Sequence, residues 1–222
     1  MSIRELAASL RRRRAAYWYY RLLRARGTFA FAGRDFRYFI HRYNRTWLNE
    51  RAVEVPIIRH VIERRPEGRL LELGNVLSHY GTVDHDVLDK YEPGERVINQ
   101  DVVDYRPATR YATIVSISTL EHVGWDEEPR NPDKIPAALA ALDRMLEPRG
   151  AMVVTVPLGY NPHLDGMLRE RKLGFEEQRY LQRISADNRW REVTWQDVDG
   201  TRYDDLYLRA SAIAVCARGC RL

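Results

Sequence analysis

Cysteine is nearly absent from this chain, which has two cysteines, Cys216 and Cys220, among 222 residues. Two cysteines are too few for a disulfide framework, and no second pair is present to complete a zinc site. Cys216 lies in an apolar run, where we expect a core residue. The sequence therefore excludes the small disulfide-rich and zinc-finger classes.

Long apolar runs are also missing. No stretch approaches the roughly 20 apolar residues of a membrane-spanning helix, and the arginine-rich start lacks the apolar segment of a secretory signal. The chain contains no internal repeat and no low-complexity linker. These absences predict a cytoplasmic protein.

The charge that is present is concentrated at one end. Residues 1–26 contain eight arginines and one acid, Glu5, for a net charge of +7, while the remaining 28 basic and 30 acidic residues give −2. The sequence pI of about 9.3 therefore reflects this tail. The body of the protein has no need of a polyanionic partner.

The tail also carries aromatic residues and would be amphipathic as a helix. One face would hold Ile3, Leu6, Leu10, Tyr17 and Tyr20, with Arg4, Arg11, Arg14 and Arg21 alongside. Such segments bind anionic membranes, here at the inner membrane surface, or nucleic acid. Charge alone discriminates weakly between these partners, and we disfavour nucleic acid. Packing of the aromatic rings against the protein's own domain is the alternative.

The segment from residue 36 to residue 65 predicts two helices. Apolar residues recur at helical spacing, at Phe36, Phe39, Ile40 and Tyr43 and again at Val53, Ile57, Ile58 and Val61. Pro56 is expected to separate the two helices or to open the second, since proline suits a first turn. We therefore expect residues 1–35 to be a basic, aromatic extension and residues 36–222 to be one domain.

Beyond residue 66, short apolar runs alternate with helical or loop segments. Runs such as "TIVSIS" and "AMVVTV" are typical of strands buried on both faces of a mostly parallel sheet. We expect strands at residues 69–73, 85–88, 96–99, 113–118, 151–156, 190–198 and 210–217, and a helix within 131–150. This alternation predicts an α/β fold with a doubly wound sheet.

The motifs at the ends of these strands, taken in order, resemble the class I S-adenosylmethionine-dependent methyltransferases. "LLELGN" is similar to the family's first motif, "HDVLDKYE" to its second strand with a terminal acid, and "VINQDVVD" to its third. "ATIVSISTLEHVG" and "LDRMLEPRGAMVVTVP" resemble the fourth and fifth strands. Over residues 52–218 the resemblance implies a Rossmann-like methyltransferase sheet, here with an N-terminal helical extension, that uses S-adenosyl-L-methionine.

The resemblance also implies which residues contact the cofactor. Gly74 would let the backbone pass close to it, Asp89 would accept from the ribose hydroxyls, and Asp101 would accept from the adenine amino group. The full expected set is Glu72, Gly74, Asn75, Asp89, Asp101, Val102, Ser118 and Glu121. For the two aspartates, a solvated surface carboxylate is the alternative.

Two departures from the family pattern bear on this site. "GNVLSHYG" replaces the usual glycine-rich loop, so His79 and Tyr80 become candidates for the roles of glycines, with a solvent-facing His79 as the alternative. Only about nine residues separate Gly74 from the second strand, whereas a parallel crossover usually takes a dozen or more, so the first crossover helix must be one or two turns long. A nicotinamide-dependent oxidoreductase would need G-x-G-x-x-G, which is absent, and a nucleotide-binding module without catalysis is a further alternative.

Methyl transfer to a hydroxyl needs an acceptor held in line with the methyl group and a base. His122 is the first candidate for the base and His163 the second, with Asp126 or Tyr160 assisting. A structural His122 that caps the strand-four turn is the alternative. Glu121, His122, Asp126 and His163 are also potential metal ligands, but no spacing requires a metal and we expect none.

The segments "PLGYNPHLDGMLRE" and "FRYFIHRYNRTWLNERAVE" flank the expected site and are rich in polar and aromatic residues. In the resembling family such positions shape the acceptor pocket. Here they suit a polar small molecule or a glycan methylated at a hydroxyl. If the glycan is lipid-linked, the basic tail would hold the protein at the membrane surface where the glycan lies. A peptide or a phenolic metabolite is the alternative.

Overall fold

The computed structural model describes residues 15, 17–24 and 26–222, and its core is one eight-stranded sheet. In spatial order the strands are β5 (Val97–Ile98), β4 (Asp86–Leu88), β3 (Leu70–Leu73), β6 (Tyr111–Ile117), β7 (Leu146–Pro157), β10 (Ala212–Arg218), β8 (Glu177–Arg183) and β9 (Trp190–Val193). The first five are parallel, and β10 is antiparallel to both neighbours. Because the strand order reverses between β3 and β6, this is the doubly wound, mostly parallel, Rossmann-like sheet that the sequence predicts.

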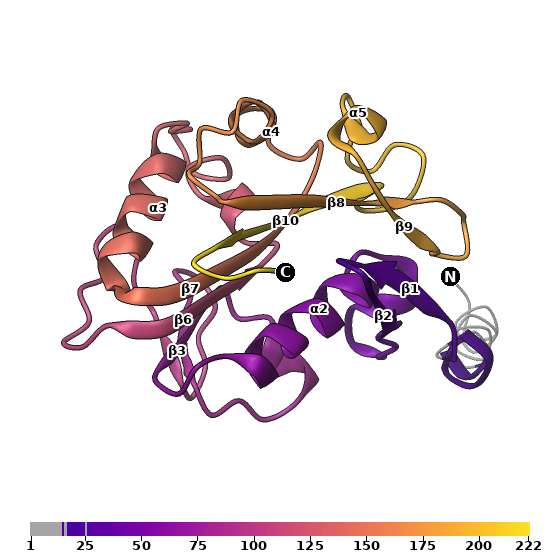
Figure 1. Cartoon of the computed structure of the whole chain (residues 1–222), viewed down its shortest axis with the longest axis horizontal. Helices are drawn as coiled ribbons and strands as arrows, with labels where there is room; N and C mark the ends of the chain where they lie inside the picture. The colour runs from indigo at the N-terminus through magenta and orange to yellow at the C-terminus, as the bar shows by residue number, and fades with distance from the viewer. Residues whose placement is uncertain (1–14, 16, 25) are drawn as a thin grey trace, which may run out of the picture.

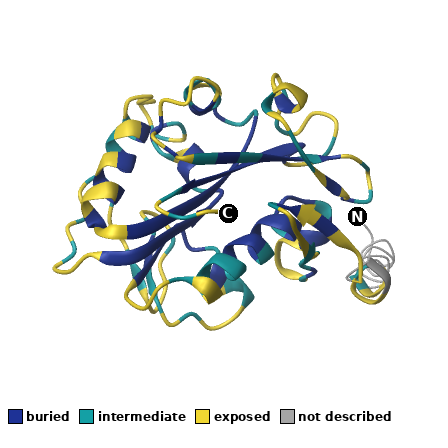
Figure 2. Cartoon of the chain, in the orientation of Figure 1, coloured by how far each residue is buried: buried dark blue, intermediate teal, exposed yellow. Residues whose placement is uncertain are grey.

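Further elements cover both faces of the sheet (Figure 1). On one face lie α3 (Lys134–Met145), α4 (Pro162–Arg169) and α5 (Trp195–Val198), and on the other lies α2 (Arg51–Arg64). The side chains of β6 alternate between these layers: Ile114 shares a buried cluster with Leu142 of α3, and Val115 shares one with Ile58 of α2. Figure 2 shows the central strands buried by this double packing, which explains their continuous apolar sequences.

Most of the predicted strands are present. The five expected between residues 69 and 156 correspond to β3–β7, and the last corresponds to β10. The first crossover is abbreviated as predicted, because η3 (Leu77–Tyr80) is a single 3-10 turn. Residues 190–198 are not one strand: β9 ends at Val193, and α5 follows from a capping box between Thr194 and Asp197. β8 was not predicted, since its sequence is largely polar.

The helix predicted from Phe36 is wrong. β1 (Thr28–Phe31) and β2 (Arg34–Arg37) pair there as an antiparallel hairpin. Its turn contains Ala32 and Gly33, which both have positive φ (51° and 73°), and its buried phenylalanines alternate with exposed residues at the period of a strand. The domain boundary expected between residues 35 and 36 falls inside β2. A 3-10 segment, η2 (Tyr43–Leu48), follows the hairpin.

Pro56 neither separates nor opens a helix, because it lies inside α2. A proline there leaves the carbonyl four residues earlier, that of Ala52, without its helical donor. The Phe39 backbone N–H donates to that carbonyl at 2.9 Å. A tertiary contact thus compensates for the hydrogen bond that proline removes.

The described part of the N-terminal tail contacts the body. The rings of Tyr17 and Tyr20 lie 5.6 and 6.1 Å from that of Trp47, and the Arg42 guanidinium lies 4.5 Å from the Tyr17 ring. The apolar positions expected at residues 3, 6 and 10 lie outside the described residues. Within the described ranges, no helix combines the length and apolar character needed to cross a membrane.

Candidate functional site

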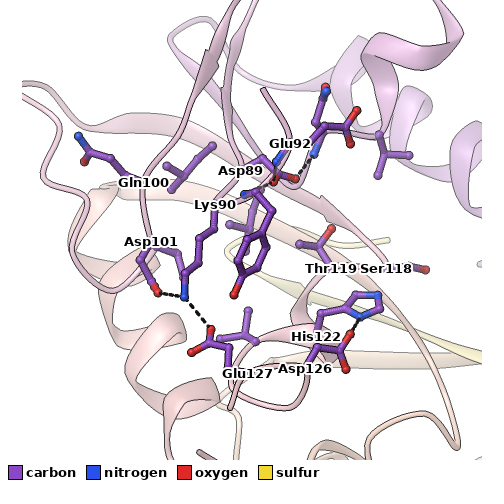
Figure 3. A pocket seen from close by; sticks show the side chains of 17 residues that line it. Asp89, Lys90, Glu92, Gln100, Asp101, Ser118, Thr119, His122, Asp126 and Glu127 are labelled. Atoms are coloured by element: carbon purple, nitrogen blue, oxygen red, sulfur yellow. Dashed lines mark hydrogen bonds and ion pairs between the residues drawn. The ribbon is translucent and has the colours of Figure 1, made fainter. Parts of the chain in front are cut away.

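A cavity of about 400 Å³ lies at the carboxyl ends of the parallel strands, beside the reversal of strand order. The segments that follow β3, β4, β5 and β6 form its walls (Figure 3). The structure brings together here the predicted site residues Asn75, Asp89, Asp101, Val102, Ser118, His122 and Asp126. The other predicted site residues, Glu72, Gly74, Glu121 and His163, do not line the cavity.

Glu72 organises the loop after β3 from beneath. Its fully buried carboxylate accepts hydrogen bonds through Oε1 from the backbone N–H groups of Val76 and Leu77, at 3.0 and 2.8 Å. Its Oε2 lies 2.9 Å from Nε2 of His85. Glu72 therefore provides the hydrogen-bond acceptor for two backbone N–H groups that a longer crossover helix would have paired internally.

Gly74 is required by a close approach between two loops. Its φ is +87°, and a Cβ there would lie 2.0 Å from Oγ1 of Thr119, after β6. Its N–H donates to the Leu88 carbonyl at 2.9 Å. Any side chain at this position would push the loops of β3 and β6 apart.

Asp89 joins the loops after β3 and β4. Its Oδ2 accepts from the backbone N–H of Asn75 at 3.0 Å, and its Oδ1 accepts from those of Tyr91 and Glu92 at 2.9 and 2.8 Å. These bonds hold the carboxylate at the cavity wall. Because each carboxylate oxygen has two lone pairs, Asp89 can still accept from a ligand.

Two lysines and two carboxylates meet on another side of the cavity. Nζ of Lys134 lies 2.6 Å from Oδ2 of Asp101 and 2.5 Å from Oε1 of Glu127, and Nζ of Lys90 lies 3.0 and 3.2 Å from the same atoms. Burial would raise the pKa of Asp101, but hydrogen bonds from Lys134, the Val103 N–H and Lys90 outweigh burial and lower it. Asp101 is therefore ionised, and its contact with adenine stays a prediction.

His122, Asp126 and Tyr160 form a hydrogen-bonded group at the edge of the cavity. Nδ1 of His122 lies 2.6 Å from Oδ2 of Asp126, and the Tyr160 hydroxyl donates to both Asp126 oxygens at 3.0 and 2.8 Å. Burial and then Asp126 raise the pKa of Tyr160, so the hydroxyl remains a donor. When Nδ1–H donates to Asp126, Nε2 carries the lone pair that a base needs.

A buried carboxyl group, that of Glu121, lies beside His122. Glu121 is 1% exposed, with Oε1 3.5 Å from Nε2 of His122 and Oε2 without a partner among the described residues. Burial raises the pKa of Glu121 well above its ordinary value. Ser118 has φ +38° and donates from Oγ at 2.6 Å to the buried Glu54, which pairs with Arg51. The Ser118 hydroxyl is thus bonded to α2, and the Glu121 carboxyl lies beside His122.

His163, the second candidate base, lies outside the cavity. It is exposed on the first turn of α4, where its ring lies 5.7 Å from that of Trp125. The alternative metal site is not assembled: in the part of the chain that the structure describes, no three or more His, Cys, Asp or Glu side chains form a metal-binding group.

His79 and Tyr80 belong to an aromatic cluster beside the loop after β3. The His79 ring stacks on Tyr43 with centroids 4.3 Å apart, and its Nε2 lies 2.8 Å from Glu92. Tyr80 packs edge to face with Phe39 at 5.1 Å. These contacts make both side chains part of the loop's packing.

Sequence reasoning missed Lys90, Glu127 and Lys134. The first follows Asp89 directly in "DKYE", so its position after a strand end was the one available signal. The other two lie in a loop and a helix after β6, where charged residues are ordinarily solvated. Only the fold brings the three together.

Three solved structures of methyltransferases are similar to this chain. No family profile and no curated protein sequence matches it. N-methyltransferase NodS from Bradyrhizobium japonicum WM9 is 14% identical over 76% of this chain and 85% of that one, with a TM-score of 0.46. A possible histamine N-methyltransferase from Thermotoga maritima is 15% identical, covering 80% and 94%, with a TM-score of 0.44. The 1,6-didemethyltoxoflavin-N1-methyltransferase of Burkholderia thailandensis is 17% identical over 72% of this chain and 74% of that one, with a TM-score of 0.44. At these identities the chemistry has to be argued from the site.

Proposed function

We propose that this protein is an enzyme that transfers a methyl group from S-adenosyl-L-methionine to a hydroxyl of a polar small molecule or glycan. One observation carries the proposal: the cavity at the strand-order reversal joins an aspartate suited to a ribose, Asp89, to a histidine, His122, whose Nδ1 is held by Asp126 (Figure 3). Holding a nucleoside and accepting a proton are the two tasks that such a transfer sets. The sulfonium of the cofactor supplies the activated methyl group.

The charge of the cavity favours S-adenosylmethionine over a nicotinamide dinucleotide. The lining has the carboxylates of Asp89, Glu92, Asp101, Asp126 and Glu127 and one lysine, Lys90. This excess of negative charge attracts a sulfonium and an ammonium group and repels a pyrophosphate. In addition, η3 is one 3-10 turn and offers no helix N-terminus for a phosphate.

The residues around His122 support a role as base. Asp126 and Tyr160 fix its ring, and Asp126 would stabilise the imidazolium that forms when Nε2 takes the acceptor's proton. The turn that carries Tyr160 is held by Asp165, whose Oδ2 accepts from the Gly159 N–H at 2.9 Å. Burial raises the pKa of Asp165 to about 6.

The cofactor assignment predicts a binding preference. By calorimetry, S-adenosylhomocysteine should bind with micromolar affinity and NAD should not bind. Asp89→Ala should weaken S-adenosylhomocysteine binding by about 1–3 kcal/mol, since the ribose hydroxyls lose a charged acceptor. Asp84→Ala is the matched control, because the Asp84 side chain, just before β4, is 93% exposed.

One outcome would contradict the cofactor assignment, and another would contradict the proposed catalysis. A preference for NAD would favour a nicotinamide-dependent protein. Binding of S-adenosylmethionine with no turnover on any hydroxyl or amine acceptor would favour a nucleotide-binding protein without catalysis.

We also propose that the basic tail brings the protein to an anionic membrane surface, where the acceptor would be a lipid-linked glycan. The charge of +7 in residues 1–26 supports this. So do Trp18, Tyr19 and Leu22, which are 49%, 52% and 58% exposed and suit the membrane interface.

A triple substitution in the tail tests the membrane proposal and leaves Tyr17 and Tyr20 in the sequence. Changing Arg11, Arg12 and Arg13 to Gln should weaken binding to phosphatidylserine vesicles by about two orders of magnitude, at roughly 1 kcal/mol per basic residue. The same change at Arg110, Arg144 and Arg149, exposed on the body, is the charge-matched control. Equal losses in the two proteins would show that net charge alone, and not the tail, governs sedimentation with vesicles.

A further inference from the structure

A second cavity, of about 270 Å³, lies at the other end of the parallel strands. The hairpin β1–β2, the C-terminal half of α2, the amino-terminal parts of β6 and β7 and residues 220–222 enclose it. Thr113 and Ala151, which are register partners in β6 and β7, belong to its lining, whereas Ser118, after β6, lines the first cavity. The length of β6 therefore separates the two cavities.

The lining of this second cavity is strongly basic. It contains no Asp or Glu side chain, and its ionisable bases are Arg34, Arg64, Arg65, Arg221 and His60. Arg34, Arg64 and Arg221 are exposed, and their side chains make no hydrogen bond or ion pair with a residue that the structure describes. Burial, followed by the positive charges of Arg34 and Arg64, lowers the pKa of His60 against the opposing effect of Glu63. The cavity lining thus carries a net positive charge.

An unpaired hydroxyl lies among these residues. Thr113 is 0% exposed, and its Oγ1 has no hydrogen-bond partner among the described residues. Its side chain shares a sheet face with Val115 and Ile117, which pack toward α2 and the hairpin. A buried hydroxyl without a partner is unfavourable, and a ligand oxygen would satisfy it once the lining around Thr113 opens on binding.

We propose that this cavity binds a small organic phosphate monoester. The phosphate would lie among Arg34, Arg64 and Arg221, and the organic part would lie against Phe31 and Phe36, which also line the cavity. Several arginines around one small volume suit a dianion with three terminal oxygens, whereas a single arginine can take a carboxylate through two parallel bonds. The cavity is at the lower limit of ligand pockets, roughly 300–1,000 Å³, which restricts the ester to a small one.

The site is one for binding and not for covalent chemistry. Cys220 is its one thiol, and burial, with the negative charges of Glu177 and Glu176, raises the pKa of that thiol. It therefore stays protonated and is a poor nucleophile. The ligand would be recognised and released unchanged, at a distance from the proposed reaction.

Calorimetry with phenyl phosphate on the full chain tests the proposal. Arg34→Ala and Arg64→Ala should each weaken phenyl phosphate binding about ten-fold or more, because a charge-assisted hydrogen bond is lost. Arg37→Ala is the matched control, since Arg37 lies on the same strand, is exposed and does not line the cavity. Circular dichroism and the melting temperature of each variant report whether it folds.

Thr113→Val separates a ligand contact from a structural role. The substitution keeps the shape and removes the unpaired hydroxyl, so the ligand-free protein should melt at the same or a higher temperature. Binding of phenyl phosphate should nevertheless weaken about five-fold, since the hydroxyl no longer meets the phosphate. A purely structural hydroxyl would leave the affinity unchanged.

Three results would overturn the proposal. The first is no binding of phenyl phosphate at millimolar concentration, and the second is equal affinity in the Arg34, Arg64 and Arg37 variants. The third is Arg34- and Arg64-dependent binding to phosphatidic acid vesicles without binding of phenyl phosphate, which would identify a lipid headgroup as the ligand. Inorganic phosphate should bind more weakly than phenyl phosphate. Equal affinities would show that the cavity recognises only the phosphate and not the organic part of the ligand.

Discussion

Replacing His122 by alanine is expected to lower turnover by about 10²–10⁴-fold, the usual contribution of a general base. His122 lines the cavity, its Nδ1 is held by Asp126, and its Nε2, which lies 3.5 Å from Oε1 of Glu121, is the nitrogen that would accept the proton. The affinity for S-adenosylhomocysteine should change little, because the residue suited to the ribose is Asp89, after a different strand. Turnover is measured as S-adenosylhomocysteine formed with an acceptor identified by mass spectrometry of the purified protein.

His163→Ala is the matched control for this experiment. It removes the second histidine near the carboxyl ends of the strands but lies outside the cavity, so turnover should stay near that of the unmodified protein. A structural His122 would behave differently: melting temperature and cofactor affinity would fall together, while the rate at saturation stayed within a few-fold. A stable, cofactor-binding and fully active His122→Ala protein would exclude His122 as the base.

Replacing Glu72 by alanine is expected to lower the free energy of unfolding by about 3–5 kcal/mol, because three partners lose their acceptor and each buried donor left unpaired costs about 1–3 kcal/mol. The change leaves the N–H groups of Val76 and Leu77 and the ring of His85 without their acceptor. The His85 side chain is 6% exposed, so water cannot readily replace the lost partner. Urea unfolding at pH 7 measures the loss.

The pair of His79 with Glu92 gives a control of the same chemistry on the surface. Its atoms are 2.8 Å apart, but the Glu92 side chain is 42% exposed. Glu92→Ala should therefore cost less than about 1 kcal/mol. Similar losses in the two variants would mean that the loop after β3 does not depend on the buried carboxylate.

The parallel core of the fold could be predicted because its signals are local. β6 and β7 are continuous apolar runs, and α3 carries an apolar stripe at helical spacing. The hairpin at residues 28–37 was missed because Phe36, continued through Phe39, Ile40 and Tyr43, also matches a helix. The choice between the two was made by pairing of β1 with β2, which depends on the turn at Ala32 and Gly33.

The site could be predicted in part for the same reason. Asp89 and His122 follow buried strands, and the carboxyl ends of parallel strands meet at one edge of a sheet. Tyr160 likewise follows β7, and both Asp126 and Tyr160 were predicted as possible helpers. Their contact was not predicted, because Tyr160 lies 34 positions from Asp126 along the chain.

The sequence by itself determined the alternation of strands and helices, the short first crossover and the acids at the strand ends, because these depend on neighbours along the chain. Only the tertiary structure decided that Lys90 and Lys134 would share the carboxylates of Asp101 and Glu127. It also decided that unpaired arginines from β2, α2 and the last residues would surround one cavity. The physical reason is that the interaction of two charges depends on their separation in space and on their burial, and neither quantity is encoded by their order in the chain.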